Sequence, residues 1–137
     1  MQTSNPENRS RRLTAVEVLQ RYMDECLPAF CDRPLLDVNQ AGCFGERPLD
    51  VAACRGDIEE MMALLEGGAD VSGEGELGNT PLHEAVGQNH LEAVKLLFYH
   101  GASTNKKNGL GQTAIDIARM HARDEIVKLL ETTGGTT

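Results

Sequence analysis

The sequence contains no tryptophan and few other aromatic residues, with two tyrosines and three phenylalanines among 137 residues. Aromatic side chains supply much of the buried volume of large globular cores. Without them, the core must be filled by leucine, valine, isoleucine, alanine and methionine. This mixture favours thin, layered helical packing, and the length suits one domain with a modest core.

Long apolar runs are also missing, so the sequence predicts no membrane-spanning helix. The four cysteines lie in the first half of the chain and form no C-x-x-C pair. Their irregular spacing indicates buried thiols in a reducing compartment, and neither a disulfide scaffold nor a zinc site. We therefore expect a cytoplasmic protein without a bound metal.

Positive charge is scarce, because the formal net charge is -8. This balance argues against a nucleic-acid partner, since phosphate binding needs clustered lysine and arginine. The charge is uneven: residues 34–77 contain ten acidic and two basic residues, whereas the chain from residue 78 onward contains six of each. The acidic segment is either a solvated face that keeps the protein soluble or a negative surface that steers a basic partner.

The sequence does contain a strict internal period. Gly45, Gly78 and Gly111 are spaced 33 residues apart. After each glycine a similar pattern returns, as RPLDVA at 47–52, TPLHEA at 80–85 and TAIDIA at 113–118. A Gly-Ala pair at 68–69 returns at 101–102. Landmarks held in register over three copies indicate a repeat architecture.

The copy at Thr80–Ala85 matches the pattern T-P-L-H-x-A at every specified position. Together with the 33-residue period, this pattern resembles the ankyrin-repeat family over residues 37–131. The resemblance implies an all-α fold, in which helix-turn-helix repeats are joined by β-hairpin-like connecting loops. No unit of this size buries its own apolar faces, so stacked neighbours must form a solenoid.

Local signals predict the boundaries within each unit. Thr80 is a helix N-cap, and Pro81 occupies the first helical position, where its missing N–H costs nothing. The first helix should break at Gly56, at Asn89 and at Ala122 in the successive copies. A hairpin-like turn should then follow the second helix of each unit.

The ends of the stack are expected to differ from its middle. The predicted organisation is a disordered tail at 1–12, a single ankyrin-repeat domain at 13–131 and a frayed tail at 132–137. Within the domain we expect a divergent N-terminal capping repeat at 13–44, followed by three recognisable repeats at 45–77, 78–110 and 111–131. In the capping repeat, Val16, Leu19, Met23 and Cys26 should form one apolar face, and Pro28 should distort the second helix.

Catalytic chemistry finds no support in the pattern. His83 begins H-E-A-V-G, which is not the zinc motif H-E-x-x-H, and the phosphate-loop pattern is absent. Aspartate stands in place of His83 at the equivalent positions 50 and 116, so the repeats maintain no common catalytic group. We expect His83 to be structural at a repeat junction, and the protein to be no enzyme and to need no cofactor.

The resemblance implies that a partner protein binds a concave face formed by hairpin tips and first helices. Carried over position by position, the candidate partner-binding residues are Phe44, Glu46, Arg55, Glu74, Glu76, Leu77, Asn79, Gln88, Leu110, Gln112, Met120 and His121. Four of them are apolar contacts, and the glutamates offer negative charge. A bulky tip residue can alternatively fold against the neighbouring hairpin.

Three functional hypotheses remain open at the level of the sequence. The first is a monomeric, non-enzymatic protein–protein interaction module. The second is an acidic inhibitor or immunity-type protein that blocks a basic partner, such as a toxin or nuclease. The third is a scaffold subunit of a larger complex. None of them involves nucleic acid or a membrane.

Overall fold

The structure, a computed structural model, describes residues 13–25, 37–42 and 45–133, and these contain helices but no β-strand. The helices are α2 (Ala15–Asp24), α3 (Pro48–Arg55), α4 (Ile58–Glu66), α5 (Pro81–Gly87), α6 (Leu91–Tyr99), α7 (Ala114–Met120) and α8 (Asp124–Thr133), with a short 3₁₀ turn, η2 (Glu76–Gly78). The expected all-α class is confirmed for this part of the chain.

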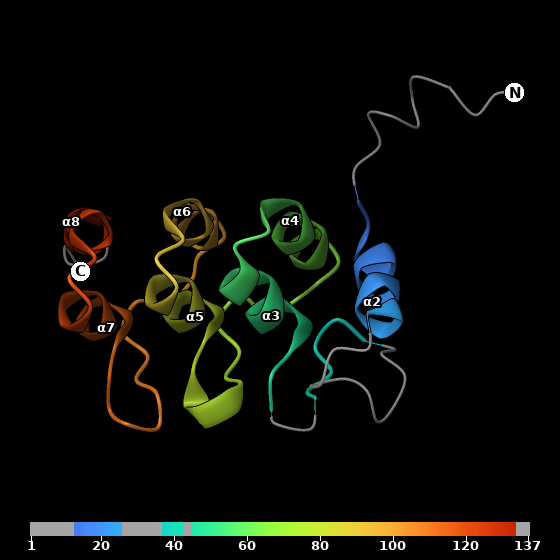
Figure 1. Ribbon diagram of the computed structural model, residues 1–137, viewed down its shortest axis with the longest axis horizontal. Coiled ribbons are helices and arrows are strands. Elements are labelled where there is room, and N and C mark those ends of the chain that lie inside the picture. Colours follow the sequence, from blue (N-terminus) through green and yellow to red (C-terminus); the bar gives the residue numbers. More distant parts are fainter. Residues whose placement is uncertain (1–12, 26–36, 43–44, 134–137) are drawn as a thin grey trace, which may run out of the picture.

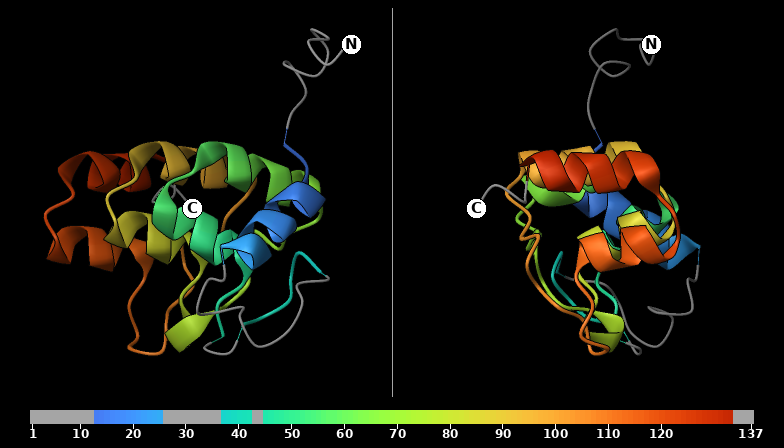
Figure 2. Two further views of the ribbon diagram at one scale, coloured as in Figure 1. Left: turned by 45° about the vertical axis from the view of Figure 1, so that its right-hand side comes forward. Right: turned by 90° about the vertical axis from the view of Figure 1, so that its left-hand side faces the viewer.

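Successive helix pairs stack in two layers (Figure 1). The first helices α3, α5 and α7 lie side by side in one layer, and the second helices α4, α6 and α8 form the other. The loops that join one pair to the next project from the first-helix layer, away from the second helices (Figure 2). Each pair therefore covers the apolar surface of its neighbour, as a solenoid requires.

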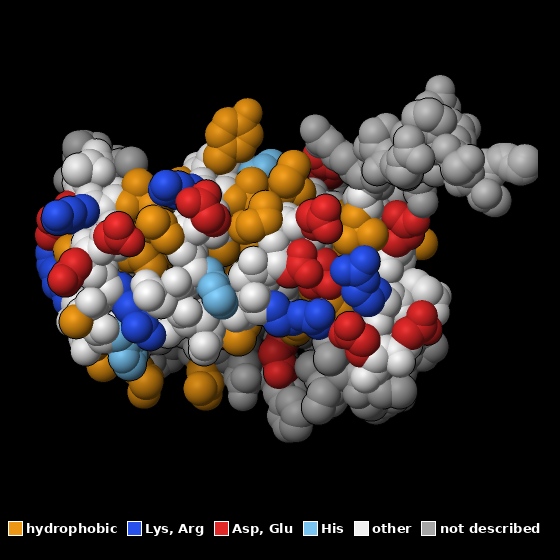
Figure 3. Space-filling view, turned by 45° about the horizontal axis from the view of Figure 1, so that its top comes forward, with side chains coloured by type: hydrophobic (Ala, Val, Ile, Leu, Met, Phe, Trp, Pro, Cys, Tyr) orange, Lys and Arg blue, Asp and Glu red, His pale blue; other side chains and the backbone are white. Residues whose placement is uncertain are grey.

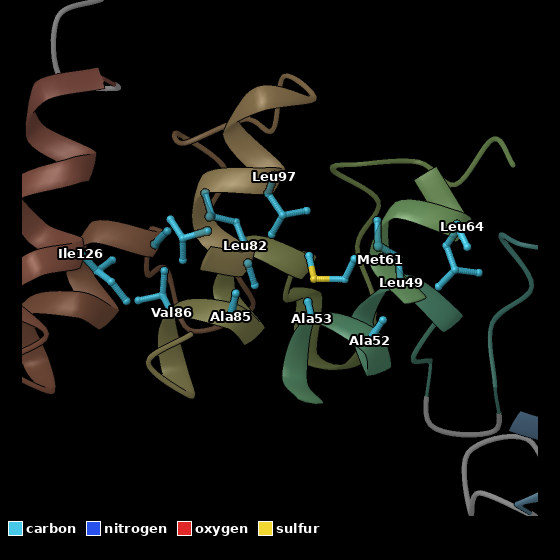
Figure 4. Close-up of a cluster of buried hydrophobic side chains, with 14 of the residues drawn as sticks. Leu49, Ala52, Ala53, Met61, Leu64, Leu82, Ala85, Val86, Leu97 and Ile126 are labelled. Carbon is cyan, nitrogen blue, oxygen red and sulfur yellow. The ribbon is translucent and has the colours of Figure 1, made fainter. Parts of the chain in front are cut away.

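The first helices approach closely because each presents an alanine at the same repeat position. Ala52, Ala85 and Ala118 are all 0% exposed. Figure 4 shows Ala52 and Ala85 on neighbouring helices of the stack. Helix α3 contacts α5, and α5 contacts α7, which confirms that the copies stack on one another.

Larger aliphatic side chains fill the space between consecutive pairs (Figure 4). Leu82, Met61, Leu97 and Ile126 are each at most 1% exposed. Full burial of one such side chain stabilises a fold by about 1.5–3 kcal/mol. The core is a continuous layer along the stack, and it contains almost no aromatic residue.

The first helices begin where the sequence predicts. Thr80 is the N-cap of α5 and Pro81 is its first residue. The hydroxyl of Thr113 likewise accepts the backbone N–H of Asp116 at 3.3 Å at the start of α7. These threonines satisfy an N–H group that the helix itself leaves unpaired.

The breaks between first and second helices are also confirmed. Gly56, Asn89 and Ala122 have φ angles of 69°, 63° and 55°. A single residue in this left-handed region ends an α-helix and turns the chain back. The N–H of the next residue then bonds a carbonyl of the first helix, as His90 does to Ala85 at 2.9 Å.

The connecting loops are hairpin-like, although none is assigned as strand in the described ranges. The N–H of Gly42, Gly75 and Asn108 donates to the carbonyl of Glu46, Asn79 and Gln112 at 2.6, 2.7 and 2.9 Å, respectively. One repeated backbone bond therefore closes each hairpin.

Helix α2 packs differently from the first helices of the later pairs. Thr14 caps it together with Glu17. Its main neighbour is the second helix α4, and it does not lie mainly beside α3 as a regular first helix would. The predicted apolar face was wrong at Val16, which is 75% exposed, whereas Val18 and Tyr22 are fully buried. On the buried side of α2, the hydroxyl of Tyr22 donates to Oε1 of Glu60 on α4 at 2.7 Å, and this bond fixes the side of the helix that faces the stack.

Other features of the predicted ends lie partly outside the described residues. These include residues 1–12 and 134–137, Cys26 and Pro28. The N-terminal capping repeat therefore stays a prediction. At the other end, α8 continues to Thr133, two residues beyond the expected repeat boundary at 131. The hydroxyl of Thr132 donates to the carbonyl of Leu129 at 3.1 Å in this last turn.

Candidate functional site

Two hairpin tips expose large apolar side chains. Leu77 is 69% exposed and Leu110, one repeat later, is 77% exposed. The alternative in which these side chains fold against neighbouring hairpins is therefore wrong for both. We call the surface formed by hairpin tips 75–79 and 108–112, with the C-terminal ends of α5 and α7, the tip face.

The two tips touch through their backbones. The N–H of Gly109 donates to the carbonyl of Leu77 at 2.7 Å. A Cβ atom on Gly109 would lie 3.0 Å from that oxygen, and one on Gly78 would lie 2.9 Å from the nitrogen of Gly109. Gly78, whose φ is 76°, therefore has no room for a Cβ, and a Cβ on Gly109 would require the Leu77 carbonyl to shift slightly.

Leu77 adopts a backbone conformation that leucine rarely takes, with φ 58° and ψ 22°. For a residue with a Cβ, the left-handed region costs about 1–2 kcal/mol. The bond between the Leu77 carbonyl and Gly109 offsets part of this cost, but that bond uses no atom of the leucine side chain. Glycine would serve the turn better, so the fold does not explain the leucine.

A network of side-chain amides links the two tips to α7. The Nδ2 of Asn108 donates to Oδ1 of Asn79 at 3.0 Å and to Oε1 of Gln112 at 3.1 Å. The Nε2 of Gln112 in turn donates to the sulfur of Met120 at 3.0 Å. The structure thus brings together three predicted site residues: Asn79, Gln112 and Met120.

Asn108 itself was missed from the sequence. Its Oδ1 accepts the backbone N–H groups of Leu110 and Gln112 at 2.9 and 3.0 Å, so this one side chain holds the turn. The available signal was a change of residue type, because the equivalent positions are Gly42 and Gly75.

The predicted acidic contacts lie in different settings. Oε2 of Glu74 is 3.9 Å from Nζ of Lys106, and both side chains are substantially exposed. Glu46 is half-buried, and its Oε1 has no hydrogen-bond partner in the part of the chain that is described. Phe44 and the side chain of Glu76 lie outside the described residues. Acidic and basic side chains are also interspersed on the face shown in Figure 3.

Arg55 is bound to the N-terminal helix. Its Nη1 donates to Oε1 of Glu25 at 3.0 Å, and its Nη2 is 3.7 Å from Oε2 of Glu60. Its guanidinium carbon also lies 5.4 Å from the ring centroid of Tyr22. The structure therefore separates Arg55 from the tip face and places it in a contact between α2 and the stack.

Gln88 and His121 are both exposed and follow the last residues of α5 and α7. Met120, directly before His121, is 63% exposed. Of these three residues, Met120 contacts hairpin tip 108–112 through Gln112, and the part of Gln88 and His121 in binding stays a prediction.

His83 joins two repeats. Its Nδ1 accepts the backbone N–H of Thr80 at 3.0 Å, so the ring proton lies on Nε2, which donates to the carbonyl of Gln112 at 2.9 Å. Burial holds the pKa of His83 below its ordinary value of 6.5. A neutral imidazole with both nitrogens bonded is a structural residue, as predicted. Its bond to the carbonyl of Gln112 holds the end of hairpin 108–112 against the start of α5.

Other kinds of site find little support. The described residues contain no group of three or more histidine, cysteine or carboxylate side chains that could hold a metal ion. An open pocket of about 250 Å³ lies where the start of α2 meets the end of α4, beside Ala15 and Gly67. Among the described helices, none has the length and apolar character needed to cross a bilayer.

Helix pairs stacked through small residues and joined by projecting hairpins define a repeat solenoid, a class of protein that presents an extended surface to its partners. A family model described as ankyrin repeats, in three copies, matches residues 13–108, so the chain belongs to the ankyrin-repeat family. Ankyrin repeats are generally protein–protein interaction modules. A search of curated proteins finds no match to the chain.

Proposed function

We propose that this protein is a non-enzymatic module that binds a partner protein on the tip face. The observation that carries the proposal is the pair of leucines at the tips. Leu77 and Leu110 are 69% and 77% exposed on two tips that touch through their backbones, so both leucines place apolar area on adjoining hairpins that are otherwise polar.

The residue choice at position 77 adds to this argument. Leu77 combines an unfavourable backbone conformation with an exposed apolar side chain. Neither property contributes to folding, and backbone strain of this kind gathers at functional sites. Selection for binding explains a leucine at this position, whereas selection for stability would favour glycine.

The partner surface implied by the tip face is apolar with polar edges. Leu77, Leu110 and Met120 supply exposed apolar area, while Asn79 and Gln112 supply amide groups beside it. Such a centre of apolar contacts bordered by hydrogen-bonding groups is typical of protein interfaces. We further propose that Glu74 and Glu46 border this surface with negative charge, and that the protein acts as a cytoplasmic monomer.

The test replaces both tip leucines with aspartate. In Leu77→Asp/Leu110→Asp, charge replaces two apolar contacts that are each worth about 1.5–3 kcal/mol, so binding should weaken by at least about tenfold. The matched control is Tyr99→Asp, because Tyr99 is 85% exposed on α6, outside the tip face. The readout is partner recovery from native lysate, followed by titration of the recovered partner.

Circular dichroism should show both variants to be folded, since the substituted side chains are exposed. The proposal fails if the double variant recovers every partner as efficiently as the parent chain. It also fails if Tyr99→Asp loses the same partners to the same extent.

The second candidate function is inhibition of a basic partner, such as a toxin or nuclease. The acidic excess of residues 34–77 favours it, and Glu74 lies beside the tips. Electrostatic steering predicts an association rate that falls steeply with added salt, whereas an apolar interface predicts a weak dependence. Rescue of cells that express a toxin encoded by a neighbouring gene would support inhibition.

A third role, as a scaffold subunit, predicts that the endogenous protein elutes in a large complex by size-exclusion chromatography with light scattering.

A further inference from the structure

Met120 differs from the other methionines of the described residues in its exposure. It is 63% exposed, whereas Met61 is fully buried and Met23 and Met62 are only partly exposed. Oxidation of a thioether requires access of the oxidant to sulfur, so exposure selects among methionines. The most exposed methionine of these four therefore lies on the tip face.

The same sulfur is connected to the hairpin tip. It accepts the Nε2–H of Gln112 at 3.0 Å, and Oε1 of Gln112 accepts from Asn108 at 3.1 Å. Asn108 in turn accepts the backbone N–H of Leu110 at 2.9 Å. Two amides therefore separate the sulfur of Met120 from the backbone of an exposed tip leucine.

We propose that Met120 is a reversible oxidation site through which peroxide weakens binding at the tip face; the binding consequence rests on the proposed function. In the reaction, the sulfur attacks one oxygen of hydrogen peroxide as the O–O bond breaks. Sulfur loses two electrons to form the sulfoxide, and the peroxide is reduced to water as a proton moves between its two oxygens. A methionine sulfoxide reductase reverses the change.

Oxidation alters the tip face in two ways. It replaces an apolar thioether by a polar sulfoxide on a surface that offers apolar area. It also replaces a weak sulfur acceptor by a strong oxygen acceptor for Gln112, because thioether sulfur accepts hydrogen bonds only weakly. The stronger acceptor should change the position of the Gln112 amide, which is bonded to Asn108. Asn108 also donates to Asn79 on the neighbouring tip, so the change reaches both tips.

The chemical test needs no partner. The full chain is treated with hydrogen peroxide and oxygen incorporation is mapped by peptide mass spectrometry. Met120 should be oxidised roughly tenfold faster than Met61, because exposure controls the reaction. The side-chain amide signals of Gln112 should shift in ¹H–¹⁵N spectra in step with oxidation, and reductase should restore them. In Met120→Leu, peroxide should leave these signals unmoved.

Equal oxidation rates of Met120 and Met61 would overturn the proposal, as would Gln112 signals that do not respond. The binding test uses the partner recovered with the parent chain. Oxidation of the parent chain should weaken its affinity for the partner at least about tenfold. The affinity of Met120→Leu should be the same before and after peroxide treatment, whatever its value. If Leu77→Asp loses the partner while the oxidised parent keeps it, the oxidation proposal is wrong and the proposed function stands. If neither change affects binding, both are wrong.

Discussion

The hydroxyl of Tyr22 on α2 donates a 2.7 Å hydrogen bond to Oε1 of Glu60 on α4, and both residues are 0% exposed. The other carboxylate oxygen of Glu60 accepts from Arg21 at 2.9 Å and lies 3.7 Å from Arg55. A buried carboxylate is tolerated only when it is paired and hydrogen-bonded. This cluster joins the N-terminal helix to the stack, and it orients α2 toward α4.

The first prediction concerns this bond. Tyr22→Phe removes the hydroxyl and leaves one oxygen of a buried carboxylate without its donor, so the free energy of unfolding should fall by about 1.5–3 kcal/mol. Chemical denaturation measures the loss. Tyr99→Phe is the control, because Tyr99 is 85% exposed and should lose almost nothing. Equal stability of the two variants would show that the Tyr22 bond contributes little.

A second prediction follows from the helix break at Ala122, whose φ of 55° is unfavourable for a residue with a Cβ. Ala122→Gly should raise the free energy of unfolding by about 0.5–1 kcal/mol. The reverse change at the equivalent position, Gly56→Ala, should destabilise the protein, because the added Cβ would lie 2.6 Å from the ring of His90. Thermal unfolding of the two variants should therefore shift in opposite directions.

A third prediction concerns pH and Asp50, which is 3% exposed. Burial raises the pKa of Asp50 from 3.8 to about 7, and the charges of Glu84 and Glu46 add to this effect. The folded state then binds the proton more tightly than the unfolded state, so this residue's contribution to stability falls as pH rises from 3.8 to about 7.

Asp50→Asn removes this titration while keeping an oxygen that accepts the N–H of Arg47. Relative to the parent, Asp50→Asn should therefore gain stability as pH rises through this window. Above the window, the gain should be on the order of 1–3 kcal/mol. Comparing variant with parent at each pH cancels the titration of His83. Asp116 is the control: its pKa is lowered from 3.8 by the backbone N–H of Thr113, so Asp116→Asn should lose stability relative to the parent as pH rises toward 3.8 and change little across the Asp50 window. A pH-independent difference for Asp50→Asn would contradict the assignment.

The fourth prediction separates stability from binding at the tip face. Leu77→Gly relieves the left-handed backbone while leaving the carbonyl that accepts from Gly109. The free energy of unfolding should rise by about 0.5–1 kcal/mol, while affinity for the partner falls because an apolar contact is lost. Calorimetry and partner titration on the same sample measure both. A variant that is less stable than the parent would refute the strain argument, and one that binds equally well would refute the role of Leu77.

Much of the fold was predictable because its determinants are local. The N-cap at Thr80, the break at Asn89 and the hairpin closure before Thr113 each depend on residues within one unit. Repetition every 33 residues then made these local signals unmistakable. The candidate tips at Leu77 and Leu110 followed from the same register; both side chains are exposed in the structure, and their role in binding stays a prediction.

The sequence by itself determined the unit, its period and the residues that begin and end its helices. Only the tertiary structure decided which side of α2 is buried, that Arg55 faces Glu60, and that Asn108 joins two hairpins to α7. Tyr22 and Glu60 lie 38 residues apart, and Asn79 and Asn108 lie 29 residues apart. Such contacts depend on how one unit rests on the next, and local spacing along the chain carries no information about that arrangement.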